Sequence, residues 1–348
     1  MIDVGSSPQR LLGIQGTLLC EEIESQSLQA NALGDSASRL LPVYLPPGYD
    51  PEGSARYPTL YCLHAFGADA SALLGTTPWT LNAVQWLDRQ ITTRRVPPAI
   101  LVIVDGFTSY GGSQYVNSAL NGDYATYVTR DVIGFVERRF RCIPRASARG
   151  LFGKSSGGFG TLHLVMEYPG LFATAAAQSA DAYFPYCYTS QFTHAQRQFE
   201  QHGGVAKFVA TFQKMPKKPH PALLAINIVA MSAAYSPKPQ ASAPLDFDLP
   251  FDPATGELRE DIWERWLRFD PARTCTERLD GFKALRRLHV ECGRRDQYTL
   301  DIGARILAHR LREAGVDVQH EEFNDDHSSI GYRHEVIYPA LLRDLDVE

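Results

Sequence analysis

The sequence alternates short apolar runs with segments of helical periodicity, and this alternation restricts the fold more than any other feature. Apolar runs of strand length lie at Pro58–His64, Ala99–Val104, Ala148–Phe152, Leu288–Cys292 and Val316–His320. By contrast, Asp123–Phe140 and Leu300–Ala314 place apolar residues at the spacing of one helix face. Strands that alternate with helices favour βαβ units. We therefore expect an α/β fold with a mostly parallel central sheet flanked by helices.

The N-terminal part of the chain, up to Leu45, lacks long helical periods and is predicted to form an antiparallel start to the same sheet. Within it, Ser38–Leu45 is strand-like but contains Pro42. Proline has no N–H to donate to a strand ladder, so this strand is expected at a sheet edge or with a bulge. The turn-forming run Pro46-Pro47-Gly48 ends it.

One segment, about 181–270, breaks the alternation because it is far longer than the usual connection between two strands. Helix-like stretches and one Pro-rich loop make up this segment: His194–Lys214, Ala222–Ala233, Arg259–Phe269 and the loop Ser236–Pro253. We interpret it as a cap-like insertion over the sheet. The whole chain, residues 1–348, is expected to be a single domain.

Composition excludes several function classes. Of the 348 residues 44% are hydrophobic, as in ordinary globular chains, and the net charge of −5 provides no basic surface for nucleic acid. The ten histidines are scattered, so we predict no metal site. No apolar stretch approaches the about 20 residues of a membrane span. The start, Met1–Pro8, lacks the basic and apolar parts of a secretory signal.

The six cysteines are dispersed and contain no C-x-x-C pair. Cys62 and Cys292 lie in apolar runs, where free cysteine usually acts as a small buried hydrophobe. A disulfide framework is not expected in a chain of this length without a signal, so we predict a reducing, cytoplasmic location. Composition leaves homo-oligomerisation open.

The run Gly153–Gly157, Gly-Lys-Ser-Ser-Gly, matches G-x-S-x-G in one frame, with Ser155 at its centre. A chance match is expected about 0.1 times in a chain of this composition, so the motif needs its context. Arg149–Phe152 precedes it as a short apolar strand, and Phe159–Tyr168 follows as a helical stretch. Such a strand-to-helix turn presents the hydroxyl at the C-terminal edge of the sheet. We predict that Ser155 is a nucleophile; the alternative is a Gly-rich turn that only permits close packing.

A serine hydroxyl needs a positioned base, and in this arrangement the acid and the histidine follow the nucleophile on loops after later strands. His327 lies just past the last predicted strand and is therefore the predicted base. Two other histidines are weaker candidates. His334 is at the start of the predicted final helix, and His320 lies within a strand, where a packing role is expected.

Asp296 directly follows the strand Leu288–Cys292 and is the predicted acid that orients the imidazole. Other nearby carboxylates lie within the strand, at a predicted helix start or next to the histidine in sequence: Glu291, Asp301, Asp325 and Asp326. The alternative for Asp296 is a solvated loop charge paired with Arg294 or Arg295.

Acyl transfer also needs N–H donors for the tetrahedral oxygen. The amide that follows the nucleophile belongs to Ser156, and the second should come from the small-residue loop at the end of Tyr61–Gly67. We predict that Phe66 supplies it. His64 precedes the nucleophile in the chain, and a role in shaping this loop is expected of it.

These motifs resemble the putative esterase family of α/β-hydrolases, which includes S-formylglutathione hydrolases, enterochelin-type esterases, feruloyl esterases and mycolyl transferases. The resemblance covers most of the chain outside 181–270 and is carried by Val43–Tyr49, Leu60–Gly67, Gly111–Ser118, Gly153–Gly160 and Tyr168–Phe172. It implies the α/β-hydrolase fold, a triad of Ser155, Asp296 and His327, and a mechanism without metal or cofactor. The chain departs from the family pattern in having His64-Ala65 instead of His-Gly.

The predicted function is that of a serine carboxylesterase that forms an acyl-enzyme on Ser155. Its partner would be a small-molecule ester with a small or medium acyl group, aromatic groups being one option. An alternative is acyl transfer to an alcohol or thiol. A non-catalytic binding protein on the same fold is a third hypothesis, against which the intact Ser, Asp, His order argues. Aromatic residues of the insertion are expected mostly in the core: Phe184, Tyr186, Tyr188, Trp263 and Trp266.

Overall fold

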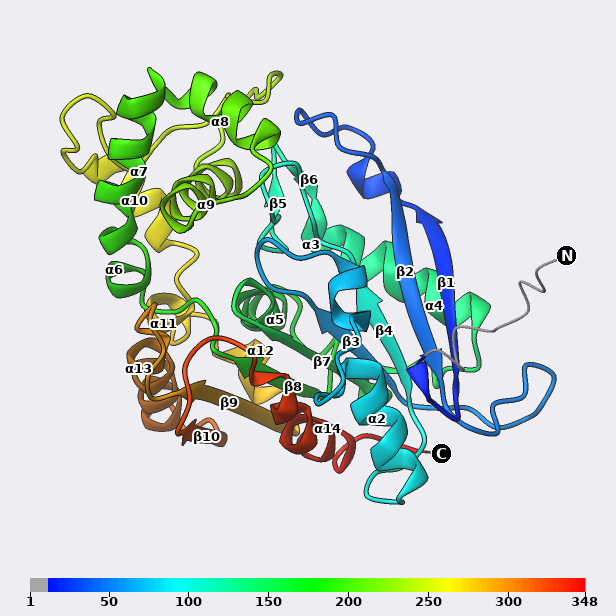
Figure 1. The fold of residues 1–348 in the computed structure, drawn as a ribbon. Helices are drawn as coiled ribbons and strands as arrows, with labels where there is room; N and C mark the ends of the chain where they lie inside the picture. Colours follow the sequence, from blue (N-terminus) through cyan, green and yellow to red (C-terminus); the bar gives the residue numbers. More distant parts are fainter. Residues whose placement is uncertain (1–11, 348) are drawn as a thin grey trace, which may run out of the picture.

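A computed structural model describes residues 12–347, so the sequence prediction for Met1–Pro8 lies outside the described residues. An eight-stranded sheet runs through the molecule (Figure 1), in the order β1-β2-β4-β3-β7-β8-β9-β10. Its strands are β1 Thr17–Glu24, β2 Ser38–Leu45, β4 Ile100–Val104, β3 Thr59–Leu63, β7 Arg149–Lys154, β8 Thr174–Gln178, β9 Arg287–Gly293 and β10 Val318–Phe323. A separate two-stranded ribbon pairs β5 Asn117–Ser118 with β6 Gly122–Asp123.

Strand directions match the expected mostly parallel sheet with an antiparallel start. β1 pairs antiparallel with β2, and β2 with β4, whereas all pairs from β4 to β10 are parallel. The prediction that Pro42 places its strand at an edge or in a bulge was wrong. β2 is an interior strand in continuous register with β1, and its ladder to β4 involves only Val43 and Tyr44. Pro42 is tolerated because it lies beyond the paired positions of that ladder.

The central strand β8, Thr174–Gln178, was not among the predicted strands. Its sequence is Thr-Ala-Ala-Ala-Gln, and alanine has a low intrinsic preference for strands. The segment is nevertheless fully buried between β7 and β9, and its small side chains admit helices on both faces. Burial in the sheet overrides local propensity here.

Helices cover both faces of the sheet, because successive strand residues point to opposite sides. On one side, Leu60 and Cys62 pack with α2 (Ala83–Thr92) and α14 (His334–Leu342). On the other, Tyr61 packs against the helical stretch 124–139. That stretch consists of α3 Tyr124–Thr126, a π-helical part Tyr127–Val132 and α4 Ile133–Arg139. The same face carries α5 Ser156–Glu167, α12 Leu279–Lys283, α13 Leu300–Glu313 and α11 Pro271–Thr274. Short 3-10 turns complete the chain: η1 Gln26–Leu28, η2 Ala70–Leu74, η4 Ala146–Ala148 and η5 Ile330–Arg333.

The long insertion between β8 and β9 is helical. It contains α6 Phe184–Cys187, α7 Thr189–His202, α8 Val205–Lys214, α9 His220–Tyr235 and α10 Glu260–Leu267. In Figure 1 these helices form one group at the side of the molecule remote from β1. The stretch His194–Lys214 forms two helices, because Gly203 and Gly204 have positive φ angles of 74° and 113° that end α7. In the described part of the chain, no helix has the length and apolarity needed to cross a bilayer.

Candidate active site

Ser155 occupies the turn between β7 and α5, with backbone angles φ 56° and ψ −121°. Positive φ is strained for a residue with a side chain and persists only where the surroundings enforce it. Here the Ser155 N–H donates to the carbonyl of Gln178 on the adjacent strand β8 at 2.9 Å, and the Ser155 carbonyl accepts the first helical bond of α5, from Phe159, at 2.8 Å. Sheet and helix therefore hold the serine in this conformation.

The two glycines of the motif are required by close backbone contacts. A Cβ on Gly157 would lie 2.1 Å from the carbonyl oxygen of Leu63, and one on Gly153 would lie 2.4 Å from the carbonyl of Gly157. No side chain fits at either position without moving the main chain. The motif is thus a packing requirement of the β3–β7–α5 junction as well as a catalytic signature.

The predicted base and the predicted acid contact each other. His327 Nδ1 lies 2.7 Å from Asp296 Oδ2, and the Asp296 side chain has no exposed surface. The other Asp296 oxygen accepts the N–H of Tyr298 at 2.9 Å. The Tyr298 ring also stands edge-on to the imidazole, with centroids 5.0 Å apart. Asp296 is therefore bonded to His327 and is not a solvated charge; Arg294 and Arg295 pair with Glu322 and Asp325 instead.

The alternative histidines and carboxylates lie elsewhere. His334 is half-buried at the start of α14, bonds to the Gly331 carbonyl and stacks on Tyr338. Burial lowers its pKa. His320 is half-buried on the edge strand β10, as expected of a packed residue. Asp301 lies in the first turn of α13.

Glu291 belongs to an ionic cluster whose side chains include three that could together hold a metal ion. His289, Glu291 and Glu321 present ligand atoms within 4.8 Å of one another. However, one guanidinium nitrogen of Arg333 lies 2.7 Å from each of the two glutamates. A cation is thus already supplied by the protein, and this cluster ties β9 and β10 to the segment that follows His327. Glu291 also accepts the side-chain amide of Gln178 at 2.7 Å.

The predicted oxyanion donors face the same cavity as the serine. Phe66 and Ser156 both line it, and among the described residues neither backbone N–H donates to another protein group. Ser156 is the first residue of α5, whose free N-terminal amides carry partial positive charge. Two free amides on the wall of a cavity are what a developing oxyanion requires.

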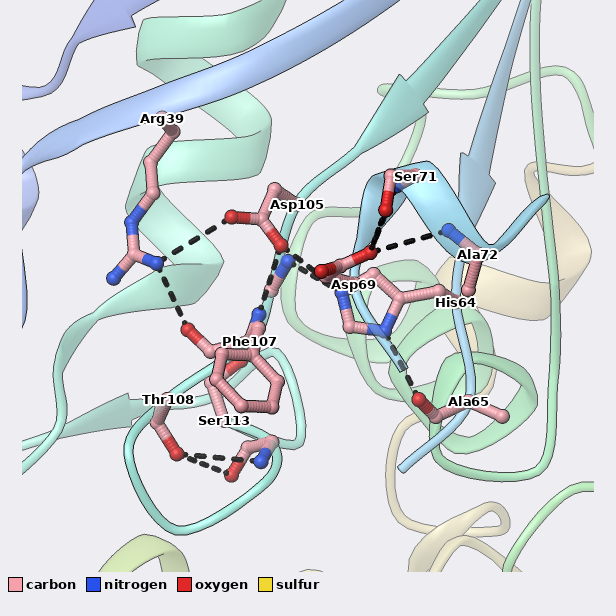
Figure 2. A network of polar contacts seen from close by, with 12 residues as sticks. Arg39, His64, Ala65, Asp69, Ser71, Ala72, Asp105, Phe107, Thr108 and Ser113 are labelled. Carbon is pink, nitrogen blue, oxygen red and sulfur yellow. Dashed lines mark hydrogen bonds and ion pairs between the residues drawn. The ribbon is translucent and has the colours of Figure 1, made fainter. Parts of the chain in front are cut away.

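His64 fixes the loop that leads to Phe66, and Figure 2 shows the bond between its ring and the Ala65 carbonyl. The Gly106 N–H donates to His64 Nε2 at 2.8 Å, so that nitrogen is the acceptor and the proton resides on Nδ1. Nδ1 then donates to the Ala65 carbonyl at 3.0 Å. Because Ala65 C=O and Phe66 N–H are opposite ends of one peptide plane, this bond directs the Phe66 N–H away from His64. His64 therefore fixes the peptide between Ala65 and Phe66, as its predicted role in shaping this loop requires.

Beyond His64, Asp105 continues this network. Its carboxylate lies 3.4 Å from His64 Nε2 and 3.4 Å from the Arg39 guanidinium, which also donates to the Phe107 carbonyl at 2.9 Å (Figure 2). Burial opposes ionisation of Asp105, but the Arg39 guanidinium and the Phe107 N–H favour the carboxylate, and its pKa is lowered. The ionised Asp105, which directly follows β4, thus forms an ion pair with Arg39 of β2 and connects the two strands next to His64.

The cavity has a volume of about 320 Å³ and contains Ser155 and His327. Its apolar walls are Phe66, Leu223, Leu224, Tyr298 and Leu300, and its polar lining groups are Lys154, Asp181, Gln191 and Asn227. Residues of the insertion supply much of the lining. Burial lowers the pKa of Lys154, the residue before the nucleophile, although Asp296 and Asp326 oppose the shift. Of the aromatic residues expected in the core, only Tyr186 is exposed, at 52%.

Fold and site together define the class of protein. The site has a strained serine between strand and helix, a histidine–aspartate pair after β9 and β10, and a cavity that the serine and the histidine line. On a sheet of this kind, these features are typical of serine hydrolases with the α/β-hydrolase fold. The family model described as "Putative esterase" matches residues 36–338. The chain therefore belongs to that family.

Some known proteins are similar to part of the chain or to its fold. Esterase Rv1288 of Mycobacterium tuberculosis is 30% identical over 142 residues, which are 40% of this chain and 28% of the relative. The uncharacterized protein YbbA of Bacillus subtilis is 22% identical over 167 residues, 43% of this chain and 59% of the relative. The matches thus span less than two thirds of either relative. A solved ferulic acid esterase shares the fold with a TM-score of 0.59 and 16% identity, over 95% of this chain and 100% of the other.

Proposed function

We propose that the protein is a serine carboxylesterase and that Ser155, His327 and Asp296 form its catalytic triad. The observation that carries the proposal is the 2.7 Å contact between His327 and the fully buried Asp296, at the cavity that also contains Ser155. A carboxylate at Nδ1 keeps the proton on that nitrogen and leaves Nε2 as the base.

The steps follow from the residues. His327 takes the proton of the Ser155 hydroxyl as its oxygen attacks the ester carbonyl, and the amides of Phe66 and Ser156 receive the charge that develops on the carbonyl oxygen. The same histidine then protonates the leaving alcohol. Water, deprotonated by His327, attacks the acyl-enzyme and releases the acid and free Ser155.

The cavity supports an ester of small or medium size. Its volume of about 320 Å³ lies at the lower end of small-molecule sites, and its walls are mainly apolar. Its aromatic lining residues, Phe66, Tyr188 and Tyr298, favour aromatic acyl groups among the substrates. We propose that the insertion between β8 and β9 acts as the cap that sets this specificity, since its residues line the cavity.

A fluorophosphonate probe, which reacts with activated serines, tests the nucleophile. We expect the probe to label the protein, and Ser155→Ala to abolish both labelling and 4-nitrophenyl acetate hydrolysis. Ser190→Ala, an exposed serine on α7, is the matched control and should keep both. Turnover that persists in Ser155→Ala would contradict the proposal.

Product analysis tests hydrolysis against acyl transfer. With an alcohol or thiol added at millimolar concentration, we expect the free acid as the main product; a dominant acylated acceptor would identify a transferase instead. The predicted cytoplasmic location and the question of homo-oligomerisation stay predictions, which cell fractionation and light scattering would test.

A further inference from the structure

The catalytic cavity contains a buried carboxyl group that the proposed mechanism does not use. Asp181 follows β8 closely in the chain, is 8% exposed, and lines the cavity together with Ser155 and His327. The hydrogen bond of His327 goes to Asp296 and not to Asp181. Asp181 is thus free for another role in the cavity.

One oxygen of this carboxyl group is held by the protein. Asp181 Oδ2 accepts the Tyr188 hydroxyl at 2.8 Å and the Gln114 amide at 3.1 Å. The same amide nitrogen lies 3.0 Å from the Tyr235 hydroxyl. The three partners come from the loop after β4, the end of α6 and the end of α9, and all are buried. This cluster therefore fixes the orientation of the carboxyl group.

The other oxygen has no such partner. Among the described residues no group donates to Asp181 Oδ1, and no lysine, arginine or histidine forms an ion pair with this carboxyl group. Oδ1 also differs from the polar atoms that are fully enclosed and unpartnered, because it keeps some accessible surface. It therefore remains accessible, and the cavity is the space that its residue lines.

A carboxyl group in this state is poised for a ligand. Burial raises the pKa of Asp181, although the hydrogen bonds from Tyr188 and Gln114 oppose the shift. A buried carboxyl with no cationic partner carries a desolvation cost, and a donor brought by a ligand offsets it. The walls of the cavity are mainly apolar, so the ligand would combine one donor with an apolar body.

We propose that Asp181 is a specificity residue whose free oxygen binds a hydrogen-bond donor, a hydroxyl or an ammonium group, on the ester substrate. The proposal rests on the proposed esterase function and deepens it by naming the substrate class. The enzyme should hydrolyse esters that carry such a donor within hydrogen-bonding distance of Asp181 with a higher kcat/KM than the same esters without it. Only the former supply a partner for the buried oxygen.

Three pairs of esters test the preference with the unmodified protein. The hydroxyl pair is 4-nitrophenyl 3-(4-hydroxyphenyl)propanoate and its methyl ether. The ammonium pair is 4-nitrophenyl 4-(aminomethyl)benzoate and the 4-methylbenzoate. A third pair, 2-hydroxyethyl and propyl butanoate, places the donor on the alcohol side. We expect at least one pair to differ in kcat/KM by about tenfold or more in favour of the donor.

Substitution then assigns the preference to Asp181. Asp181→Asn is nearly isosteric and can still accept from Tyr188, but it can present an N–H donor where the free oxygen was. For the pair that the wild-type protein discriminates, we expect this variant to reduce the ratio of kcat/KM between the two esters by about tenfold or more. Asp261→Asn makes the same chemical change at an exposed position of α10 and should leave the ratio unchanged. Fluorophosphonate labelling of each variant shows whether its active site is intact.

Each outcome decides between the two proposals. Hydrolysis of all pairs without discrimination by the wild-type protein would overturn the role of Asp181 alone, and needs no variant. A ratio that survives in Asp181→Asn would do the same. If neither labelling nor hydrolysis of any ester, 4-nitrophenyl acetate included, is detected, the proposed esterase function fails and this inference fails with it.

Discussion

His327 Nδ1 lies 2.7 Å from Oδ2 of Asp296, a carboxylate whose side chain has no exposed surface. The pair joins the loops after β9 and β10, which neighbour each other in the sheet. Because Asp296 also accepts the Tyr298 N–H, its carboxyl cannot rotate away without losing two hydrogen bonds. The geometry therefore fixes one tautomer of the imidazole, with Nε2 free to accept a proton.

Replacing this carboxylate by an amide should disable the base while keeping the fold. Asp296→Asn can present its NH₂ group to Nδ1 and so favour the wrong tautomer. We expect kcat for 4-nitrophenyl acetate to fall by about 10⁴-fold. Asp301→Asn, in the first turn of α13, is the control and should stay within about threefold of wild type. A loss below about tenfold in Asp296→Asn would show that another group orients His327.

Removal of the His64 side chain should weaken the oxyanion hole without touching the nucleophile. In His64→Phe, nothing holds the Ala65 carbonyl, so the Phe66 N–H loses its fixed direction. We expect kcat to fall by about 10²-fold with little change in KM, because the lost donor acts mainly in the transition state. His64→Asn, whose amide can still donate to Ala65, should recover part of the loss. An equal loss in both variants, or a change confined to KM, would argue against a positioning role.

Alanine at Gly157 should destabilise the whole protein. Its Cβ would meet the Leu63 carbonyl at 2.1 Å, and backbone on both sides leaves little room for relaxation. We expect the free energy of unfolding to drop by about 2 kcal/mol or more. Gly331→Ala, where no atom lies within 4 Å of the added Cβ, is the matched control and should be close to neutral. Urea unfolding curves of the two variants measure the difference; equal midpoints would refute the steric requirement.

The buried cluster around Glu291 should make stability depend on pH. Burial opposes ionisation of Glu291, but hydrogen bonds from His289 and Arg333 outweigh it and lower its pKa from the ordinary 4.5. Glu291 therefore contributes stability that is complete above about pH 5 and is lost as the pH falls through its lowered native pKa. At neutral pH we expect Glu291→Gln to cost about 3 kcal/mol, since the buried Arg333 loses a partner.

Urea unfolding of both proteins between about pH 7 and pH 3 checks this linkage. The stability difference between wild type and Glu291→Gln should shrink towards the acid end, because the wild-type carboxyl is then protonated as well. Glu313→Gln, at an exposed position of α13, should show no such convergence. A difference that stays constant across the range would mean that folding does not lower the pKa of Glu291.

Parts of this site follow from short stretches of sequence. Gly153, Ser155 and Gly157 lie within one strand–turn–helix unit, so their conformation is set largely by residues inside that unit. Asp296 and His327 could be predicted because parallel strands deliver the loops that follow them to the same edge of the sheet. The periodicity that located the helices 124–139 and 300–313 is equally local.

Long-range packing decided the rest. Strand β8 forms because its alanines are buried between two neighbours, against their own weak preference, and Pro42 lies in an interior strand because its ladder to β4 begins after it. Asp181 and Gln114 are 67 residues apart, and no pattern along the chain shows that they share a hydrogen bond. Which polar groups are buried together, and which oxygen is left free, depends on the folded arrangement of distant loops. Local sequence therefore determines most of the conformation around the proposed nucleophile, whereas tertiary contacts decide which polar groups line the cavity.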